Sequence, residues 1–98
     1  MKFVTDFKEF GGKGGSVVSH TQKLPEKEKN KIVAYMNTKP VIAVRASCIN
    51  DYFENKYTTK SDAVRSDGEY NWSEEEAYHF EKYDMELNED FIQKVMNL

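Results

Sequence analysis

The pattern of hydrophobic and polar positions in the first twenty residues predicts short, irregular elements. Phe3, Phe7 and Phe10 recur at spacings of four and three, which is a helical period, although a short strand through Phe3 fits the same residues. The glycine-rich residues 11–16 then form a turn or hinge, because Lys13 is not followed by the Ser or Thr that a phosphate-binding loop requires. The stretch "SVVSH" after this loop predicts a short strand.

The middle of the chain predicts one helix and one strand. The stretch "LPEKEKNKIVAYMN" begins near Pro25, which suits a first helical turn, and it ends in an apolar stripe of Ile32, Val33 and Met36. In "KPVIAVRAS", the near-continuous apolar run at residues 41–44 is typical of a central strand that is buried on both faces. We expect "CINDYFENKY" to leave this strand as one helical turn.

A β-hairpin is predicted where Asp67 and Gly68 lie between two short segments, residues 63–66 and 69–72. Asp-Gly favours a two-residue turn because Gly tolerates positive φ and Asp tolerates the left-handed region. In the second strand of this hairpin, Tyr70 and Trp72 share one face because side chains alternate along a strand.

Two helices are predicted after the hairpin. Ser73 is a suitable N-cap for the first, and Glu76 three residues later completes a capping box. Asn88 is a suitable cap for the second, whose apolar stripe consists of Phe91, Ile92, Val95 and Met96. We therefore expect a single α+β domain over residues 1–98. Its small mixed or antiparallel sheet would contain the strand at 41–46 and the hairpin at 63–72, packed against about three helices.

Composition supports one soluble domain. The chain has 98 residues, of which 13 % are aromatic and 32 % are charged, and its mean hydropathy is -0.78. No apolar run approaches the roughly 20 residues that span a bilayer. The first ten residues carry acids where a signal peptide has its apolar stretch, so we expect a cytoplasmic protein. The single cysteine, Cys48, fits a reducing compartment, and its place after an apolar run predicts a buried thiol.

Charge is distributed unevenly along the chain. Residues 1–50 contain nine Lys and Arg against four Asp and Glu, a net charge of +5, whereas residues 51–98 contain five against thirteen, a net charge of -8. Trp72 and most of the tyrosines also lie in this acidic half. Nucleic-acid binding combines aromatic residues with basic ones, whereas the negative charge of this half would repel nucleic-acid phosphates. We expect no binding to nucleic acid and an attraction to basic partners, unless the acids serve only solubility.

Catalytic and metal chemistry has weak support in the sequence. Glu76 and His79, three residues apart on a predicted helix, could place two metal ligands on one face, but His20 is the only other histidine and lies in an unrelated setting. The first-turn position of Glu74 and Glu75 already explains these acids as helix-start residues. We therefore expect no cofactor and no enzymatic activity.

Protein binding fits the acidic segment better than catalysis does. Tyr and Trp are favoured at binding hot spots, and clustered charge speeds association. The candidate partner-binding residues are Asp67, Glu69, Tyr70, Trp72, Glu74, Glu75, Tyr78 and Glu81. A purely structural alternative is that Tyr70 and Trp72 belong to the core.

Five stretches between residues 31 and 95 carry a family resemblance: "KIVAYMNTKPVIAV", "DYF", "DGEYNWS", "AYHFEKY" and "LNEDFIQKV". Together they resemble a recurring pattern in small bacterial immunity proteins, the cytoplasmic antidotes of polymorphic toxin systems that include contact-dependent growth inhibition. The resemblance implies a protein that neutralises a cognate toxin by binding it. Many toxin domains of these systems are nucleases with basic clefts, which an acidic inhibitor would suit.

Two alternatives to the immunity function remain. A phage or mobile-element protein that inhibits a host nuclease or defence protein would share the acidic binding surface. A small metal-binding protein or enzyme would instead use Glu76 and His79. The oligomeric state does not follow from the sequence.

Overall fold

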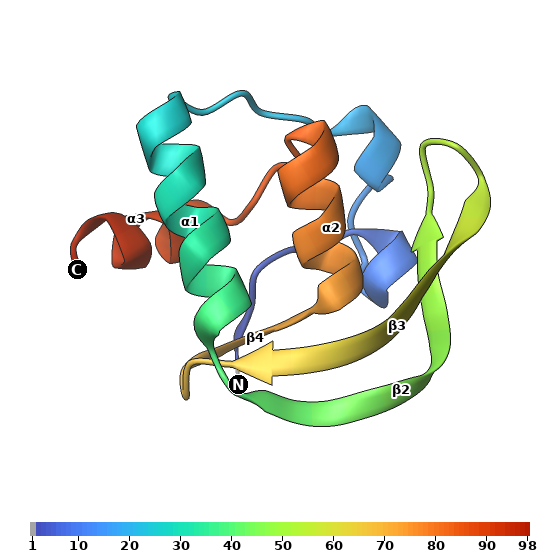
Figure 1. Cartoon of the computed structure of the whole chain (residues 1–98). Helices are drawn as coiled ribbons and strands as arrows, with labels where there is room; N and C mark the ends of the chain where they lie inside the picture. Colours follow the sequence, from blue (N-terminus) through green and yellow to red (C-terminus); the bar gives the residue numbers. More distant parts are fainter. Residues whose placement is uncertain (1) are drawn as a thin grey trace.

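The computed structural model describes residues 2–98 and contains a four-stranded sheet with the strand order β1-β4-β3-β2. The strands are β1 (Lys2–Phe3), β2 (Val41–Asp51), β3 (Lys56–Ser66) and β4 (Tyr70–Ser73). The helices are α1 (Glu26–Thr38), α2 (Glu74–Tyr83) and α3 (Glu89–Met96). Helices α1 and α2 lie side by side over one face of the sheet (Figure 1). The predicted α+β class is confirmed.

Two consecutive hairpins build most of the sheet. Strand β2 pairs antiparallel with β3, and β3 pairs antiparallel with β4 across the turn at Asp67 and Gly68. The hairpin forms where it is predicted, and Gly68 has a φ of 96°. Its turn is longer than the predicted two residues, because Ser66 pairs with Asn71 and the Asp67 N–H donates to the Tyr70 carbonyl oxygen. Strand β1 then pairs parallel with β4, which makes the sheet mixed.

The core lies between the sheet and the three helices. Trp72, which is 1 % exposed, packs with Tyr35 and Phe91 at ring-centroid distances of 6.0 and 5.4 Å. Its indole Nε1 donates a hydrogen bond to the carbonyl oxygen of Met36 at the end of α1, 3.2 Å away. Trp72 therefore joins the sheet to two helices through one side chain.

Strand β2 differs from its prediction. It lies at the edge of the sheet rather than in its centre, and residues 41–48 are all exposed, including Cys48, which we expected to be buried. Its pairing with β3 is irregular between Val44 and Cys48, where the register shifts. An apolar run identifies a strand, but the position of that strand in the sheet depends on its neighbours.

The segment after β2 is also different from its prediction. In place of a helical turn, β2 continues to Asp51 and turns back into β3 at Lys56. Asn55 adopts a left-handed conformation with φ 54° in this turn. The two long strands form a curved hairpin that extends beyond the helices (Figure 1).

The N-terminal region folds as short pieces. The short strand through Phe3 forms, residues Lys8–Phe10 form a 3₁₀ turn, and "SVVSH" forms a second 3₁₀ turn rather than the predicted strand. The glycine loop folds back on Asp6, whose carbonyl oxygen accepts a hydrogen bond from the Gly14 N–H at 2.7 Å. A Cβ atom at Gly12 would lie 2.3 Å from the Asp6 backbone, so this position requires glycine.

In residues 2–98, no helix combines the length and the apolar character needed to cross a membrane.

Candidate functional site

Helix α2 begins with the predicted capping box. The Ser73 hydroxyl accepts a hydrogen bond from the Glu76 N–H, and the Glu76 carboxylate accepts one from the Ser73 N–H, both at 3.0 Å. The second oxygen of Glu76 accepts a hydrogen bond from the Thr5 hydroxyl at 2.7 Å. The capping box therefore also ties the N-terminal segment to the start of α2.

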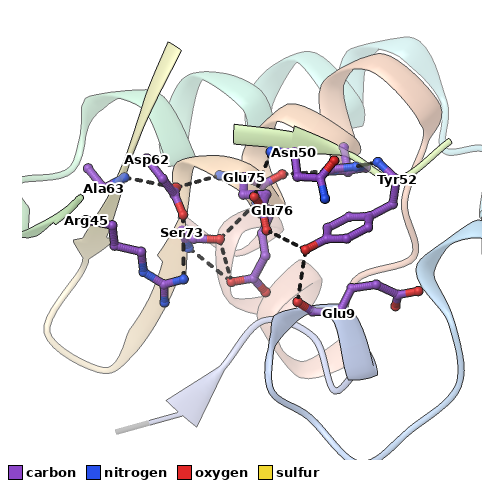
Figure 2. A network of polar contacts seen from close by, with 10 residues as sticks. Glu9, Arg45, Asn50, Tyr52, Asp62, Ala63, Ser73, Glu75 and Glu76 are labelled. Carbon is purple, nitrogen blue, oxygen red and sulfur yellow. Dashed lines mark hydrogen bonds and ion pairs between the residues drawn. The ribbon is translucent and has the colours of Figure 1, made fainter. Parts of the chain in front are cut away.

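Glu75 connects α2 to the β2–β3 hairpin (Figure 2). Its carboxylate accepts hydrogen bonds from the Asn50 N–H at 2.9 Å and from the Tyr52 hydroxyl at 3.4 Å. Its own N–H donates to the carboxylate of Asp62 at 3.1 Å. Asp62 is buried, and it forms an ion pair with Arg45 at 3.6 Å. These contacts close a polar network between the hairpin and the helix.

Burial disfavours the charged form of both glutamates in this network. The pKa of Glu75 is raised because its carboxylate loses contact with water, although the Asn50 N–H partly offsets this effect. The pKa of Glu76 is raised for the same reason, against the hydrogen bonds from Thr5 and Ser73. The hollow bordered by Glu75, Tyr52 and Arg45 has a volume of about 220 Å³.

His79 is held by hydrogen bonds to the main chain. Its Nε2 accepts a hydrogen bond from the Tyr52 N–H at 3.1 Å, so Nδ1 carries the proton and donates to the Glu75 carbonyl oxygen 2.7 Å away. The Nδ1 bond within α2 orients the ring, and the Nε2 bond fixes the residue after β2 against α2. Within residues 2–98, no group of three or more His, Cys, Asp and Glu is arranged to hold a metal ion.

Asp51 is the centre of a second buried network. Its carboxylate is 0 % exposed and accepts hydrogen bonds from the hydroxyls of Tyr78 and Tyr83, at 2.6 and 2.7 Å. It also accepts from the N–H groups of Phe53 and Glu54 in the β2–β3 turn. Burial opposes ionisation, but these donors outweigh it and hold the pKa of Asp51 well below its usual range. The hydrogen bond to Asp51 raises the pKa of Tyr83 to about 12.

Four of the eight candidate binding residues lie around the β3–β4 turn and serve the fold. Tyr70 and Trp72 are buried in the core, as in the structural alternative. The Asp67 side chain accepts from the Tyr35 hydroxyl at 2.6 Å and from Lys94 at 2.9 Å. Glu69 is exposed and forms ion pairs with Lys2 and Lys94. A partner could contact Glu69, but Tyr70 and Trp72 are inaccessible in this conformation.

The other candidate residues lie on α2, and the structure brings three of them together. Glu74, Tyr78 and Glu81 recur at helical spacing and line a hollow of about 280 Å³ with Ile49 and Lys60. Glu81 is exposed, Tyr78 is half-buried, and Glu74 forms an ion pair with Arg65. We call Glu74, Tyr78 and Glu81 the α2 ridge. Glu75 points away from this ridge into the buried network.

Sequence reasoning missed the residues that hold the two networks together. They are Asp51, Asp62, Tyr52 and Arg45. A signal existed for Asp51, because Asp followed by "YFEN" is suited to a turn in which the carboxylate caps the next N–H groups. No comparable local signal marked Asp62, whose partners come from β2 and α2.

Replacing Glu76 with glutamine should stabilise the protein at neutral pH. A folded-state pKa raised above the unfolded value gives stability that is complete at low pH and is lost as the pH rises through the folded pKa. Glutamine retains an acceptor for the Ser73 N–H and never ionises. We expect a gain in the free energy of unfolding at pH 7 and almost none at pH 4. Urea titrations at both pH values measure this difference.

The control for this experiment is Glu81→Gln, which removes the same charge from an exposed position on the same helix. Its stability should stay within about 0.5 kcal/mol of wild type at both pH values. Equal effects of the two substitutions would contradict the assignment to burial of Glu76.

Comparisons of the chain with protein-family models, with curated proteins and with solved structures found no match.

Proposed function

We propose that this chain is a cytoplasmic immunity protein, which binds and neutralises a cognate bacterial toxin domain without catalysing a reaction. The proposal rests on the resemblance of residues 31–95 to that class. It is supported by one structural observation: the only candidate binding residues grouped on an accessible surface are those of the α2 ridge. By contrast, the groups suited to chemistry, Glu75, Glu76 and His79, accept or donate hydrogen bonds inside the fold.

The chemistry of the α2 ridge suits recognition of a basic partner. Glu81 offers an exposed carboxylate, and Tyr78 offers a half-buried ring next to it. A tyrosine contributes contact area at low entropic cost, and an exposed carboxylate accelerates encounter with a positive surface. A nuclease toxin, whose cleft is basic because it holds phosphate, would be attracted by this surface and blocked by the bulk of the inhibitor.

Co-expression with the product of the adjacent upstream gene tests the function. We expect the neighbouring product to be toxic when expressed alone, growth to be restored by this protein, and the two proteins to co-purify. Two controls show that rescue is specific. An empty vector should not restore growth, and this protein should not restore growth of cells that express an unrelated toxin. Persistent toxicity with a soluble, folded protein would contradict the immunity assignment.

The charge of the α2 ridge gives a sharper prediction. Glu81→Lys should slow association with the cognate toxin by about tenfold at low salt, because a repulsive charge replaces an attractive one. Glu86→Lys, an exposed position beyond the end of α2, makes the same change in net charge outside the ridge. Stopped-flow association rates at two salt concentrations distinguish them. Equal rates for the two variants would remove the ridge from the binding mechanism.

A further inference from the structure

Strand β2 leaves part of the sheet edge open. It is the last strand in the order β1-β4-β3-β2, so its outer side has no neighbouring strand. From Asn50 onward, α2 closes that side, because the Asn50 N–H donates to Glu75 and the Tyr52 N–H donates to His79. Residues 41–48 lie outside this closure, and every one of them is exposed. We call them the open segment.

The open segment carries apolar side chains in an exposed position. Val41, Ile42 and Val44 are 46, 54 and 78 % exposed. Natural proteins usually protect such an edge with charges, proline or a covering loop, because its unpaired N–H and C=O groups bind other strands. Pro40 and the irregular pairing near Arg45 limit the open edge but leave Val41 to Val44 uncovered. An added strand would bury these side chains and pair the backbone.

The charge around the open segment selects the strand that would bind. Lys39 precedes the open segment and Arg45 lies within it, whereas Lys60 lies on β3 next to Ser61, the pairing partner of Cys48. Of the nearest acids, Glu74 is paired with Arg65, and Asp62 is buried and shares the charge of Arg45. Lys39 and Lys60 are the other positive charges of this region. A second copy of the chain would bring two such basic strands together and repel itself. An acidic strand has the complementary charge.

We propose that residues 41–48 accept an extended, acidic segment of a partner protein as an added β-strand. Main-chain hydrogen bonds to β2 would supply affinity, and apolar and acidic side chains in alternation would meet Val44 and Arg45. The proposal is independent of the immunity function, because any partner with such a segment would bind. The α2 ridge lies on a different element, although Lys60 borders both surfaces.

Peptide binding to the full chain tests the proposal. The probe is a synthetic peptide as long as the open segment, with valine and glutamate in alternation, titrated into labelled protein and followed by amide NMR shifts. We expect saturable binding with shifts concentrated at residues 41–48. A peptide with lysine for glutamate should bind at least about tenfold more weakly. Methylation of alternate backbone nitrogens should abolish binding, because it removes the ladder donors.

The peptide experiment would overturn the proposal in any of three ways: no saturable binding of the acidic peptide, equal binding of the methylated peptide, or shifts concentrated outside the open segment. Self-association that depends on protein concentration and moves the same resonances would replace the acidic partner with a second copy, and would also overturn it. Analytical ultracentrifugation of the free protein measures that outcome.

A pair of variants at Val44 tests the charge argument. Val44 is the most exposed apolar residue of the open segment, so neither lysine nor glutamate should disturb the core. Val44→Glu should weaken binding of the acidic peptide by about tenfold, and Val44→Lys should preserve or tighten it. Both remove the same apolar contact, so only charge distinguishes them. Equal losses from the two variants would contradict an acidic occupant.

Discussion

Replacement of Trp72 with alanine should reduce the free energy of unfolding by about 4 kcal/mol. The change removes the largest fully buried side chain, its contacts with Tyr35 and Phe91, and its hydrogen bond to Met36. The free energy of unfolding of a single domain is roughly 5–15 kcal/mol, so this substitution removes a large part of it. Urea denaturation followed by circular dichroism measures the effect, because the chain has no second tryptophan for fluorescence.

Trp72→Phe is the matched control. It keeps an aromatic ring against Phe91 but loses the indole donor, so we expect a cost of about 1–2 kcal/mol. Trp72→Ala could instead leave stability within about 1 kcal/mol of wild type and abolish partner binding. That result would identify Trp72 as a contact residue and contradict its assignment to the core.

Replacement of Asp51 with alanine should cost about 3 kcal/mol. The carboxylate joins the β2–β3 turn to the hydroxyls of Tyr78 and Tyr83 on α2, and alanine leaves these donors without their acceptor. Asp51→Asn keeps one acceptor for the turn but loses the charge, so its cost should be smaller. Chemical denaturation at pH 7 ranks the three proteins.

The pH dependence of this effect has a defined sign. The pKa of Asp51 is lower in the folded state, so its contribution is present above the unfolded value near 4 and is lost as the pH falls through the folded pKa. The stability difference between wild type and Asp51→Asn should therefore shrink between pH 5 and about pH 2. A difference that stays constant over this range would show that charge is not the source of the stabilisation.

The features that sequence reasoning predicted correctly depend on neighbouring residues. The turn at Gly68 needs only a glycine that tolerates positive φ, and the capping box needs only Ser73 and Glu76 at a spacing of three. Both features depend only on residues that are a few positions apart in the sequence. The α+β class follows because these local elements can only bury their apolar faces against one another.

The features that it missed depend on distant residues. Strand β2 was expected in the centre of the sheet because an apolar run gives no information about neighbouring strands. Glu75 was expected on the surface because its partners, Asn50 and Tyr52, come from a hairpin that the sequence did not reveal. Residue type alone does not distinguish a binding residue from a core residue: Tyr70 and Trp72 are buried, whereas Glu81 is exposed.

The pairing of β1 with β4 has a consequence for synthesis of the protein. Lys2 is opposite Tyr70, and the Asn88 N–H donates to the carbonyl oxygen of Val4. Residues 2–4 therefore gain these partners only when residues 70–88 have emerged from the ribosome. Contacts between such distant residues form late because they close a long loop. We expect a nascent chain truncated before residue 70 to be sensitive to protease around residues 2–5, and a chain that extends through residue 88 to be protected there.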